Sequence, residues 1–509
     1  MISVSSAWKE AQKQLLAPES FVEISCSLTE IGVQEEATAT GIDEAIFSDI
    51  SAVPGTSGEQ TIKKYATLET NLWVLDGTRN TIPTTEPYAN VGYVCDIANA
   101  GSVTLTLPEV HTVGIPGITI TWSSEYGEYA TKFTVVAKNG ETVIAETTVL
   151  DNTKNISLVY LDIANYDSVT VTVLEWSVPD HRSRIDLVRL GLDLTFSKSE
   201  IINYAHEQHG CILSGELPKN SIEFSVDNTS NRWNPNNPTG LERYLSERQR
   251  LTARYGLDIN GTTEWIKAGT FYLSEWRAPS NGLEASFVAR DILEYMINVP
   301  YTGIREGTLN DIANAAIEQA DLPIGTVVRL NLGEPGNYTI KPFTENYSIA
   351  EVLQLCANAA GCAMYQDRNG KLRIEYRGTI LSDYAIPSEL SYSWPEIELT
   401  KNLKEVAVSY GEEGKYVLSV NDFGETQTVD NPLINSEEHA AYLANLVMAQ
   451  LKPRKSITGE YRADPRLDLF DCISVDTKFG TISPVIVSNI KYSFSGAFRC
   501  NYTAKVWEG

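Results

Sequence analysis

The sequence predicts a mainly β protein with α+β parts. Alternating apolar and polar residues recur along the chain, most clearly at 103–107, 118–122 and 169–173, and such alternation is typical of strands with one solvated face. Helical periodicity occurs in few places. With 42% hydrophobic and 21% charged residues among 509, the chain has a globular composition, and its length suggests about three domains at roughly 100 to 200 residues each.

Residues 83–180 are predicted to form an all-β sandwich. They contain all three alternating runs and no helical period of useful length, and turn signals such as Asn139-Gly140 separate the runs. About 100 residues is a normal size for a sandwich. Proline-rich stretches at 81–87 and 177–183 mark both ends, as expected for an insertion at an exposed turn. The sandwich therefore interrupts a first β domain, which comprises 1–82 and 181–302.

Residues 303–395 are predicted to form an α+β domain. Thr308 and Ser348 each begin a capping pattern, because Asp311 and Glu351 follow three residues later and apolar residues continue at helical spacing. Each pattern predicts a helix that buries one face.

A hairpin and a third helix follow. Asn369-Gly370 lies between two short apolar runs and predicts a tight hairpin turn. Residues 436–451 carry an apolar stripe at helical spacing, and Pro453 ends that helix. This helix lies between strand-rich stretches, so residues 396–509 are predicted to be a second β domain that contains it.

The charge balance excludes one class of function. Forty Lys and Arg against 66 Asp and Glu give a net charge of −26, whereas proteins that bind duplex nucleic acid through its phosphates need a basic face. No apolar run approaches the roughly 18 residues of a membrane helix. We therefore expect no membrane span and a chain made in the cytoplasm.

The seven cysteines indicate neither a disulfide framework nor a zinc ribbon. They are scattered, odd in number and without a Cys-x-x-Cys pair, so buried reduced thiols are expected. They are Cys26, Cys95, Cys211, Cys356, Cys362, Cys472 and Cys500.

Motifs for catalysis are lacking. No phosphate-binding glycine loop, nucleophile elbow or His-Glu-x-x-His helix is present. His206, His209 and Cys211 have metal-like spacing if they lie on a helix, but a fourth ligand is missing and structural histidines are the favoured interpretation. Paired glycosidase carboxylates cannot be located by spacing, and a solvated acidic surface is favoured. We expect no enzyme, cofactor or metal.

Aromatic residues of the sandwich are the better candidates for a binding site. Tyr126 and Tyr129 lie in a loop-like stretch, and Trp122 precedes it, so these three are candidate carbohydrate-binding residues. Packing is the favoured alternative for each ring, and above all for Trp122, which continues a buried alternation. Three more aromatic residues lie in or beside the strands: Tyr160, Tyr166 and Trp176.

Ten segments that together span nearly the whole chain follow one another in a characteristic order. They are residues 63–77, 115–126, 131–136, 178–185, 211–228, 348–361, 367–374, 431–434, 464–473 and 490–499. Their order resembles the tail hub, or tail-associated baseplate hub, of tailed bacteriophages, especially those in prophages of Gram-positive bacteria.

The resemblance implies two tail-tube-like β-barrel domains per chain, with an embedded carbohydrate-binding-like sandwich. It also implies a homotrimer at the distal end of the tail tube, in the virion, which joins the hexameric tube to the tail tip or baseplate and carries spike or fibre proteins. Genomic DNA would pass through the hub without specific binding, so side chains that line the barrels are predicted to be acidic on balance.

Two other functions remain open. The sandwich could bind host cell-wall polysaccharide, which would make the chain an adhesin. An enzyme that acts on the cell envelope has the least support, because no catalytic motif was found.

Overall fold

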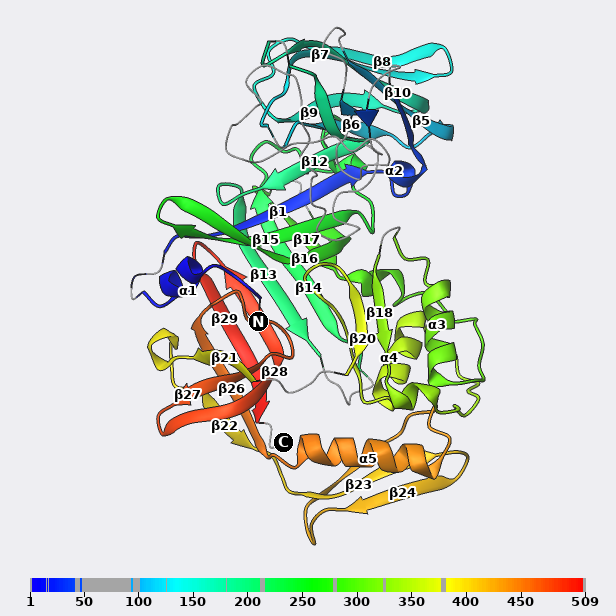
Figure 1. Cartoon of the computed structure of the whole chain (residues 1–509), viewed down its shortest axis with the longest axis vertical. Helices are drawn as coiled ribbons and strands as arrows, with labels where there is room; N and C mark the ends of the chain where they lie inside the picture. The colour runs from blue at the N-terminus through cyan, green and yellow to red at the C-terminus, as the bar shows by residue number, and fades with distance from the viewer. Residues whose placement is uncertain are drawn as a thin grey trace, which may run out of the picture. The chain divides into compact units, whose positions relative to one another are not determined.

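The computed structural model confirms a mainly β protein with α+β parts (Figure 1). It describes residues 2–14, 16, 18–41, 46–47, 93–94, 101–124, 126–179, 181–210, 216–277, 282–323, 326–376 and 381–506. The chain forms two compact units. The first comprises Met1–Ile24, Phe196–Asn234 and Arg250–Gly509, and the second comprises Ser25–Thr195 and Pro235–Gln249.

Antiparallel strands dominate the first unit. Along one sheet they follow the order β15-β16-β17-β14-β13-β28-β29-β26-β22, and β27 pairs with β28 and β21. Their bounds are β13 Ile201–His209, β14 Lys219–Asp227, β15 Arg250–Ile259, β16 Thr262–Arg277, β17 Glu284–Arg290, β21 Leu381–Ile386, β22 Glu396–Leu399, β26 Lys455–Arg462, β27 Cys472–Thr477, β28 Gly480–Phe494 and β29 Phe498–Val506. Helix α1, Ser6–Gln12, precedes them.

The two predicted β domains share this sheet. Strand β13 pairs with β14 on one side and with β28 on the other, with Tyr204 opposite Phe494 and His209 opposite Asn489. Burial alternates along β29, as expected for a strand with one face toward a core. Strands from residues 201–290 and 455–506 are therefore hydrogen-bonded into one structure.

An arginine from the α+β segment is enclosed beside this sheet. Arg368 is 4% exposed and lies in the predicted hairpin turn. Its guanidinium donates to the carbonyl oxygens of Pro465 and Leu467, both at 2.6 Å, and lies 3.4 Å from Asp468 Oδ1. Buried charges are tolerated when they are paired and hydrogen-bonded, and here one side chain connects segments about a hundred residues apart.

The two predicted capped helices are confirmed as α3, Leu309–Gln319, and α4, Ile349–Ala359. Thr308 Oγ1 accepts from the amide of Asp311 at 3.2 Å, and Asp311 accepts from the amide of Thr308 at 2.9 Å. Ser348 and Glu351 form the same reciprocal pair. Each such capping box supplies hydrogen-bond acceptors for backbone amides at the start of the helix, because these amides have no partner within the helix.

The predicted Asn-Gly hairpin is confirmed as β19, Ala363–Gln366, and β20, Leu372–Glu375, which pair antiparallel. Strand β18, Val328–Asn331, adds to β20 in parallel. Short 3₁₀ turns also occur in this unit: η2 Ile292–Tyr295, η3 Glu334–Asn337 and η4 Ser388–Leu390.

The third helix is confirmed as α5, Glu437–Leu451, but it packs with the α+β segment and not with the second β domain in which the sequence placed it. Its buried stripe shares one apolar core with α3 and α4. His439 Nε2 also lies 2.7 Å from the carbonyl oxygen of Ala359, at the end of α4. Three strands complete this region: β23 Leu403–Tyr410, β24 Gly414–Ser419 and β25 Glu425–Val429.

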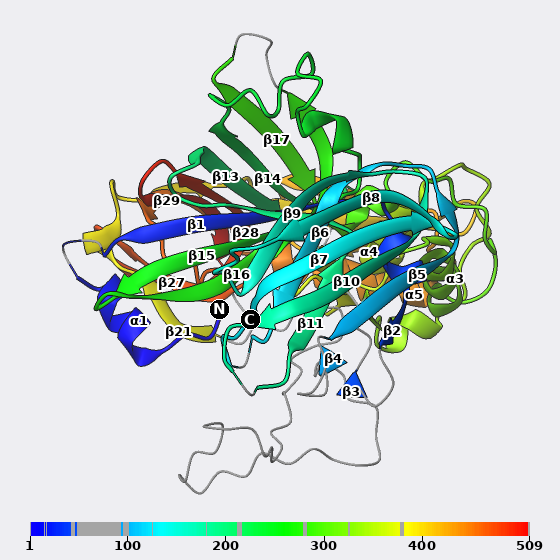
Figure 2. The same ribbon diagram turned by 90° about the horizontal axis from the view of Figure 1, so that it is seen from above.

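The second unit is a sandwich of two five-stranded sheets, with orders β2-β5-β10-β7-β8 and β3-β4-β11-β6-β9. Figure 2 shows β5, β10, β7 and β8 as neighbouring strands. The bounds are β2 Thr38–Gly41, β3 Ile46–Phe47, β4 Tyr93–Val94, β5 Ser102–His111, β6 Ile115–Trp122, β7 Ala130–Asn139, β8 Thr142–Val149, β9 Ile156–Ile163, β10 Tyr166–Trp176 and β11 Arg184–Arg189, with helix α2 Val33–Glu36 and turn η1 Glu242–Tyr244.

The sandwich extends beyond the predicted range of 83–180. Strand β2 pairs with β5, and β11 pairs with β6, so segments on both sides of that range complete the two sheets. An interior strand left without these neighbours would expose unpaired backbone groups. The chain crosses between the units within β1, Ser20–Thr29, and at the end of β12, Gly191–Phe196.

Among the described residues, no helix combines the length and the apolar character needed to cross a membrane.

Candidate functional site

The loop between β6 and β7 contains the tyrosines that the sequence singled out. Ser123 and Glu128 form a bridge across it, and Gly127 adopts a φ of +69°. The side-chain amide of Asn155 donates to the carbonyl oxygens of Ser123 at 2.8 Å and Glu128 at 3.3 Å. These bonds hold both ends of the loop in a defined conformation.

The three candidate aromatic rings lie against the protein. Trp122 is fully buried, contacts Phe133 edge to face at 5.0 Å and donates from Nε1 to Ser157 Oγ at 2.8 Å. Tyr129 is half-buried and packs on the same core. Tyr126 is half-buried, and the guanidinium carbon of Arg184 lies 4.9 Å from its ring centroid. The Trp122 ring therefore has no face available to a glycan, and the face of Tyr126 toward Arg184 is covered.

A buried carboxylate that the sequence did not reveal lies beneath this loop. Glu128 is 6% exposed, and its two oxygens lie 2.8 Å from Trp176 Nε1 and 2.6 Å from His181 Nδ1. Both oxygens therefore have partners from the far end of the sandwich sequence. These contacts of Glu128 hold the loop against the end of β10 and the segment that follows it.

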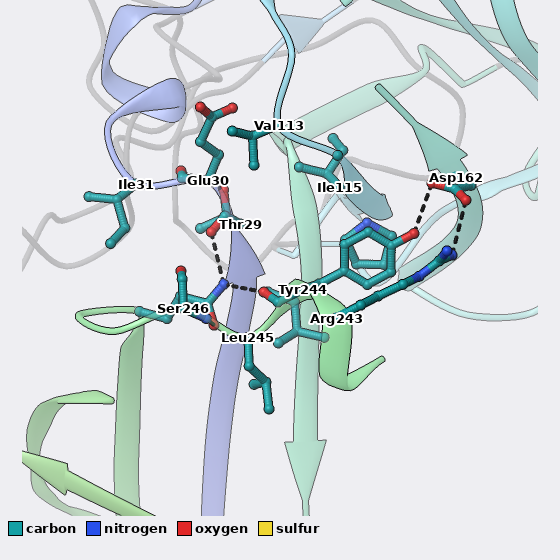
Figure 3. Close-up of a pocket in the computed structure, with 14 residues that line it drawn as sticks. Thr29, Glu30, Ile31, Val113, Ile115, Asp162, Arg243, Tyr244, Leu245 and Ser246 are labelled. Atoms are coloured by element: carbon teal, nitrogen blue, oxygen red, sulfur yellow. Dashed lines mark hydrogen bonds and ion pairs between the residues drawn. The ribbon is translucent and has the colours of Figure 1, made fainter. Parts of the chain in front are cut away.

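A pocket lies elsewhere in the sandwich unit (Figure 3). It has a volume of about 590 Å³ and is formed by the end of β1, the start of β6, strand β9 and the turn around η1. Its lining residues are Leu28, Thr29, Glu30, Ile31, Val113, Gly114, Ile115, Pro116, Asp162, Arg243, Tyr244, Leu245, Ser246 and Gln249.

One wall of the pocket carries a fixed polar group. In Figure 3, Arg243 and Tyr244 both point toward Asp162. The guanidinium donates to one carboxylate oxygen of Asp162 at 3.0 Å and the phenol donates to the other at 2.8 Å. Burial and then this hydrogen bond raise the pKa of Tyr244 to about 12, so the phenol remains a protonated donor at neutral pH.

A buried glutamine holds the turn that carries these two residues. Gln249 is 2% exposed, and its Nε2 donates to the carbonyl oxygens of Thr29 at 3.0 Å and Tyr244 at 2.8 Å. Its Oε1 accepts from the amide of Ser246 at 3.1 Å. Hydrogen bonds within the protein thus hold this wall of the pocket.

Comparisons with known proteins found similar solved structures, of which three at low sequence identity are described below. No protein-family model and no curated protein matches the chain. A tail protein from Neisseria meningitidis MC58 is 13% identical, with a TM-score of 0.42 over 61% of this chain and 95% of that one. The 43 kDa tail protein of prophage MuSo2 from Shewanella oneidensis is 13% identical, with a TM-score of 0.41 over 61% and 94%. Prophage tail protein gp18 from Listeria monocytogenes EGD-e is 11% identical, with a TM-score of 0.39 over 61% and 91%.

The histidines with metal-like spacing lie on a strand, not on a helix. On β13, residues three apart point to opposite faces, so His206 and His209 cannot converge on one ion. His206 is fully buried, and its ring nitrogens lie 2.6 Å from the hydroxyl of Tyr255 and 2.8 Å from Asn220 Oδ1. Cys211, the third residue of that pattern, lies outside the described residues. Over the described parts of the chain, no group of three metal-ligating side chains occurs.

The cysteines that the structure describes are buried free thiols, as predicted: Cys26, Cys356, Cys362, Cys472 and Cys500. Burial raises the pKa of Cys356 to about 12, so the reactive thiolate is disfavoured. Cys95 lies outside the described residues.

Proposed function

We propose that the chain is a structural protein of a phage tail, namely the hub at the distal end of the tail tube. The observation that carries the proposal is the order of segments along the chain, which resembles tail hubs from residue 63 to residue 499. The architecture is compatible with this role, since a sandwich interrupts a large antiparallel sheet and an α+β segment lies between its two sets of strands. In this role the protein joins the tube to the tail tip or baseplate and carries spike or fibre proteins in the virion.

The hub is proposed to be a homotrimer, and strand β22 is the proposed contact. It ends the order of the sheet and is exposed along its whole length. Ile397 and Leu399 are 43% and 61% exposed, and Trp394 just before the strand is 52% exposed. Exposed apolar sheet edges of this kind favour pairing with another chain.

Light scattering tests this contact. The wild-type chain should have the mass of a trimer when alone, or should contribute three copies to a complex with its tube partner. Ile397→Lys should reduce it to a monomer. Val417→Lys is the matched control, because Val417 is 46% exposed on β24 and should tolerate the charge without a change of mass. A wild-type chain that stays monomeric in both conditions would contradict the proposal.

The DNA channel through the hub is proposed to have an acidic wall. The net charge of −26 supports this, because an acidic wall repels phosphate and lets the genome pass without binding. An image of the assembled tail tip at side-chain resolution tests it. A channel lined with Lys and Arg would refute it.

We also propose that the sandwich unit binds host cell-wall carbohydrate. The pocket supports this second function, since it combines apolar walls with a fixed group of polar side chains. Retention of the full chain on purified host cell walls tests the idea, with walls stripped of polysaccharide as the control. Equal retention on both preparations would speak against it.

A further inference from the structure

We infer that the pocket of the sandwich unit is a binding site for a neutral saccharide. The inference rests on the second proposed function, and it assigns the binding to residues other than the candidate aromatics Trp122, Tyr126 and Tyr129. Four features of the pocket carry it: its size, its charge, its fixed polar group and its apolar wall.

The size fits a small ligand. A volume of about 590 Å³ falls within the roughly 300 to 1,000 Å³ of typical small-molecule sites. The lining residues come from four segments of one unit, so the site does not depend on how the two units are arranged. Gln249 fixes the turn that forms one side, which limits the ordering that binding requires.

The charges favour a neutral ligand over an ion. Arg243 is the one cationic side chain among the lining residues, and the carboxylate of Asp162 neutralises it at 3.0 Å. Glu30 supplies a second carboxylate and lies 3.0 Å from His111 Nδ1. An anion such as phosphate would meet two carboxylates and one guanidinium that is already paired. An amine would find each carboxylate already in contact with a basic side chain.

The polar group suits vicinal hydroxyls. Asp162, Arg243 and Tyr244 are joined by two hydrogen bonds, and the side chains of Arg243 and Asp162 are 47% and 62% exposed, so their other N–H groups and lone pairs are accessible to a ligand. The Arg243 guanidinium carbon also lies 4.7 Å from the centroid of the Tyr244 ring. Neighbouring hydroxyls on a sugar ring can donate to the carboxylate and accept from the guanidinium at the same time.

The apolar wall suits the carbon face of a sugar ring. Ile115 and Pro116 line the pocket from the start of β6, with Val113 just before that strand. Leu28 lines it from the end of β1, with Ile31 just after that strand. A ligand with hydroxyls at its edge and C–H groups on its face satisfies both kinds of wall. A purely apolar ligand would desolvate the remaining N–H groups and lone pairs of the polar group and would give them no new partner.

The test is a titration of the full-length protein followed by ligand-observed NMR and calorimetry. N,N′,N″-Triacetylchitotriose and cellotriose are the saccharide probes, because both are neutral and they differ only in the group at C2 of each ring, acetamido in one and hydroxyl in the other. Inorganic phosphate and lysine represent the anionic and cationic alternatives. We expect binding of at least one trisaccharide, with a Kd in the millimolar range or tighter, and no measurable binding of phosphate or lysine.

Two conservative variants and one blocking variant assign the binding to the pocket. Asp162→Asn and Tyr244→Phe should each weaken saccharide binding about tenfold, because each alters one member of the polar group. Val113→Trp should abolish binding by filling the pocket, and it removes no hydrogen bond of that group. Glu146→Gln is the matched control, since Glu146 is exposed on β8 of the same unit and should bind like the wild type.

Three results of the binding titrations would overturn the inference. They are no binding of either trisaccharide by the wild type, binding of phosphate or lysine instead, and saccharide binding that Val113→Trp leaves unchanged. If Asp162→Asn fails to fold, as circular dichroism would show, Val113→Trp still decides the question. If Val113→Trp is still retained on host walls, the pocket is not the binding site. The second proposed function, binding of host cell-wall carbohydrate by the sandwich unit, would then survive.

Discussion

The interiors of the two units enclose polar groups in different ways. Beside the large sheet of the first unit, Arg368, His206 and Tyr255 are buried together, and their partners come from strands and turns far apart in the sequence. The sandwich unit also buries polar side chains, among them Gln34 and Arg184, both 3% exposed, but its buried carboxylate, Glu128, lies in a loop beside the apolar core. The buried cation Arg368 therefore links distant segments of the first unit beside its sheet, whereas the Glu128 contacts link one loop of the sandwich to the segment that follows β10.

The largest effect is expected at Arg368. Arg368→Met removes the donors for two carbonyl oxygens and the partner of Asp468, so it should lower the free energy of unfolding by about 3–5 kcal/mol. Denaturant unfolding measures the loss, and hydrogen exchange should rise in β13 and β28 but not in β7 and β10. Arg329→Met is the control, because its side chain is 60% exposed and should cost about 1 kcal/mol at most. Equal stability of Arg368→Met and wild type would contradict the comparison.

The next effect depends on pH. Burial raises the pKa of Asp291 to about 7 from 3.8, so the folded state retains a proton that the unfolded state loses. Stability is therefore lost as pH rises from about 4 to 7, by up to about 4 kcal/mol. Asp291→Asn cannot ionise and can still cap through its side-chain oxygen, which accepts from Leu293 at 3.1 Å in the wild type. In denaturant titrations, the free energy of unfolding of Asp291→Asn minus that of the wild type should increase from about pH 4 to pH 7. A difference that does not change with pH would refute the raised pKa of Asp291.

A smaller effect is expected at the buried carboxylate of the sandwich. Glu128→Gln places an amide NH₂ against one of two donors, Trp176 or His181. It should therefore lower the free energy of unfolding by about 1–3 kcal/mol. Hydrogen exchange should rise in the 123–129 loop and leave the first unit unchanged. Glu146→Gln again serves as the exposed control. A loss spread over both units would show that the two interiors are not independent.

The smallest effect tests the apolar part of the two interiors. Ile120 in the sandwich and Ile490 in the first unit are both fully buried. Ile120→Val and Ile490→Val should each cost about 0.5–1.5 kcal/mol, because the same methyl group is removed from a packed core. Chemical denaturation of both variants measures this. If the losses of unfolding free energy in the two variants differ by more than the width of this range, the two units differ in apolar packing as well as in their buried polar groups.

Local features were predictable from the sequence. Thr308 with Asp311 and Ser348 with Glu351 satisfy helix amides within four residues, and Asn369-Gly370 sets a turn by its own backbone preference. These signals need no knowledge of distant segments.

Features that depend on distant contacts were not predictable. Pro465 and Leu467, whose carbonyl oxygens accept from Arg368, lie 97 and 99 residues away from it in sequence. The pocket is likewise formed by four separate segments. The spacing of His206 and His209 suits a shared metal ion only on a helix, and pairing with the neighbouring strands places both residues on β13. The apolar stripe of helix α5 is visible in the sequence, but only the structure shows that this stripe packs in the core formed with α3 and α4.

The pairing of β13 with β28 has a consequence for synthesis on the ribosome. Tyr204 emerges about 290 residues before its partner Phe494, so β13 has one unpaired edge during most of translation. Contacts of such long range slow folding, and an open strand edge invites association with other chains. A chain cut after residue 454 would lack β26 to β29 and every carbonyl partner of Arg368 described above. We therefore expect truncated translation products to aggregate, because the first unit cannot complete its sheet until the C-terminal strands have been synthesised.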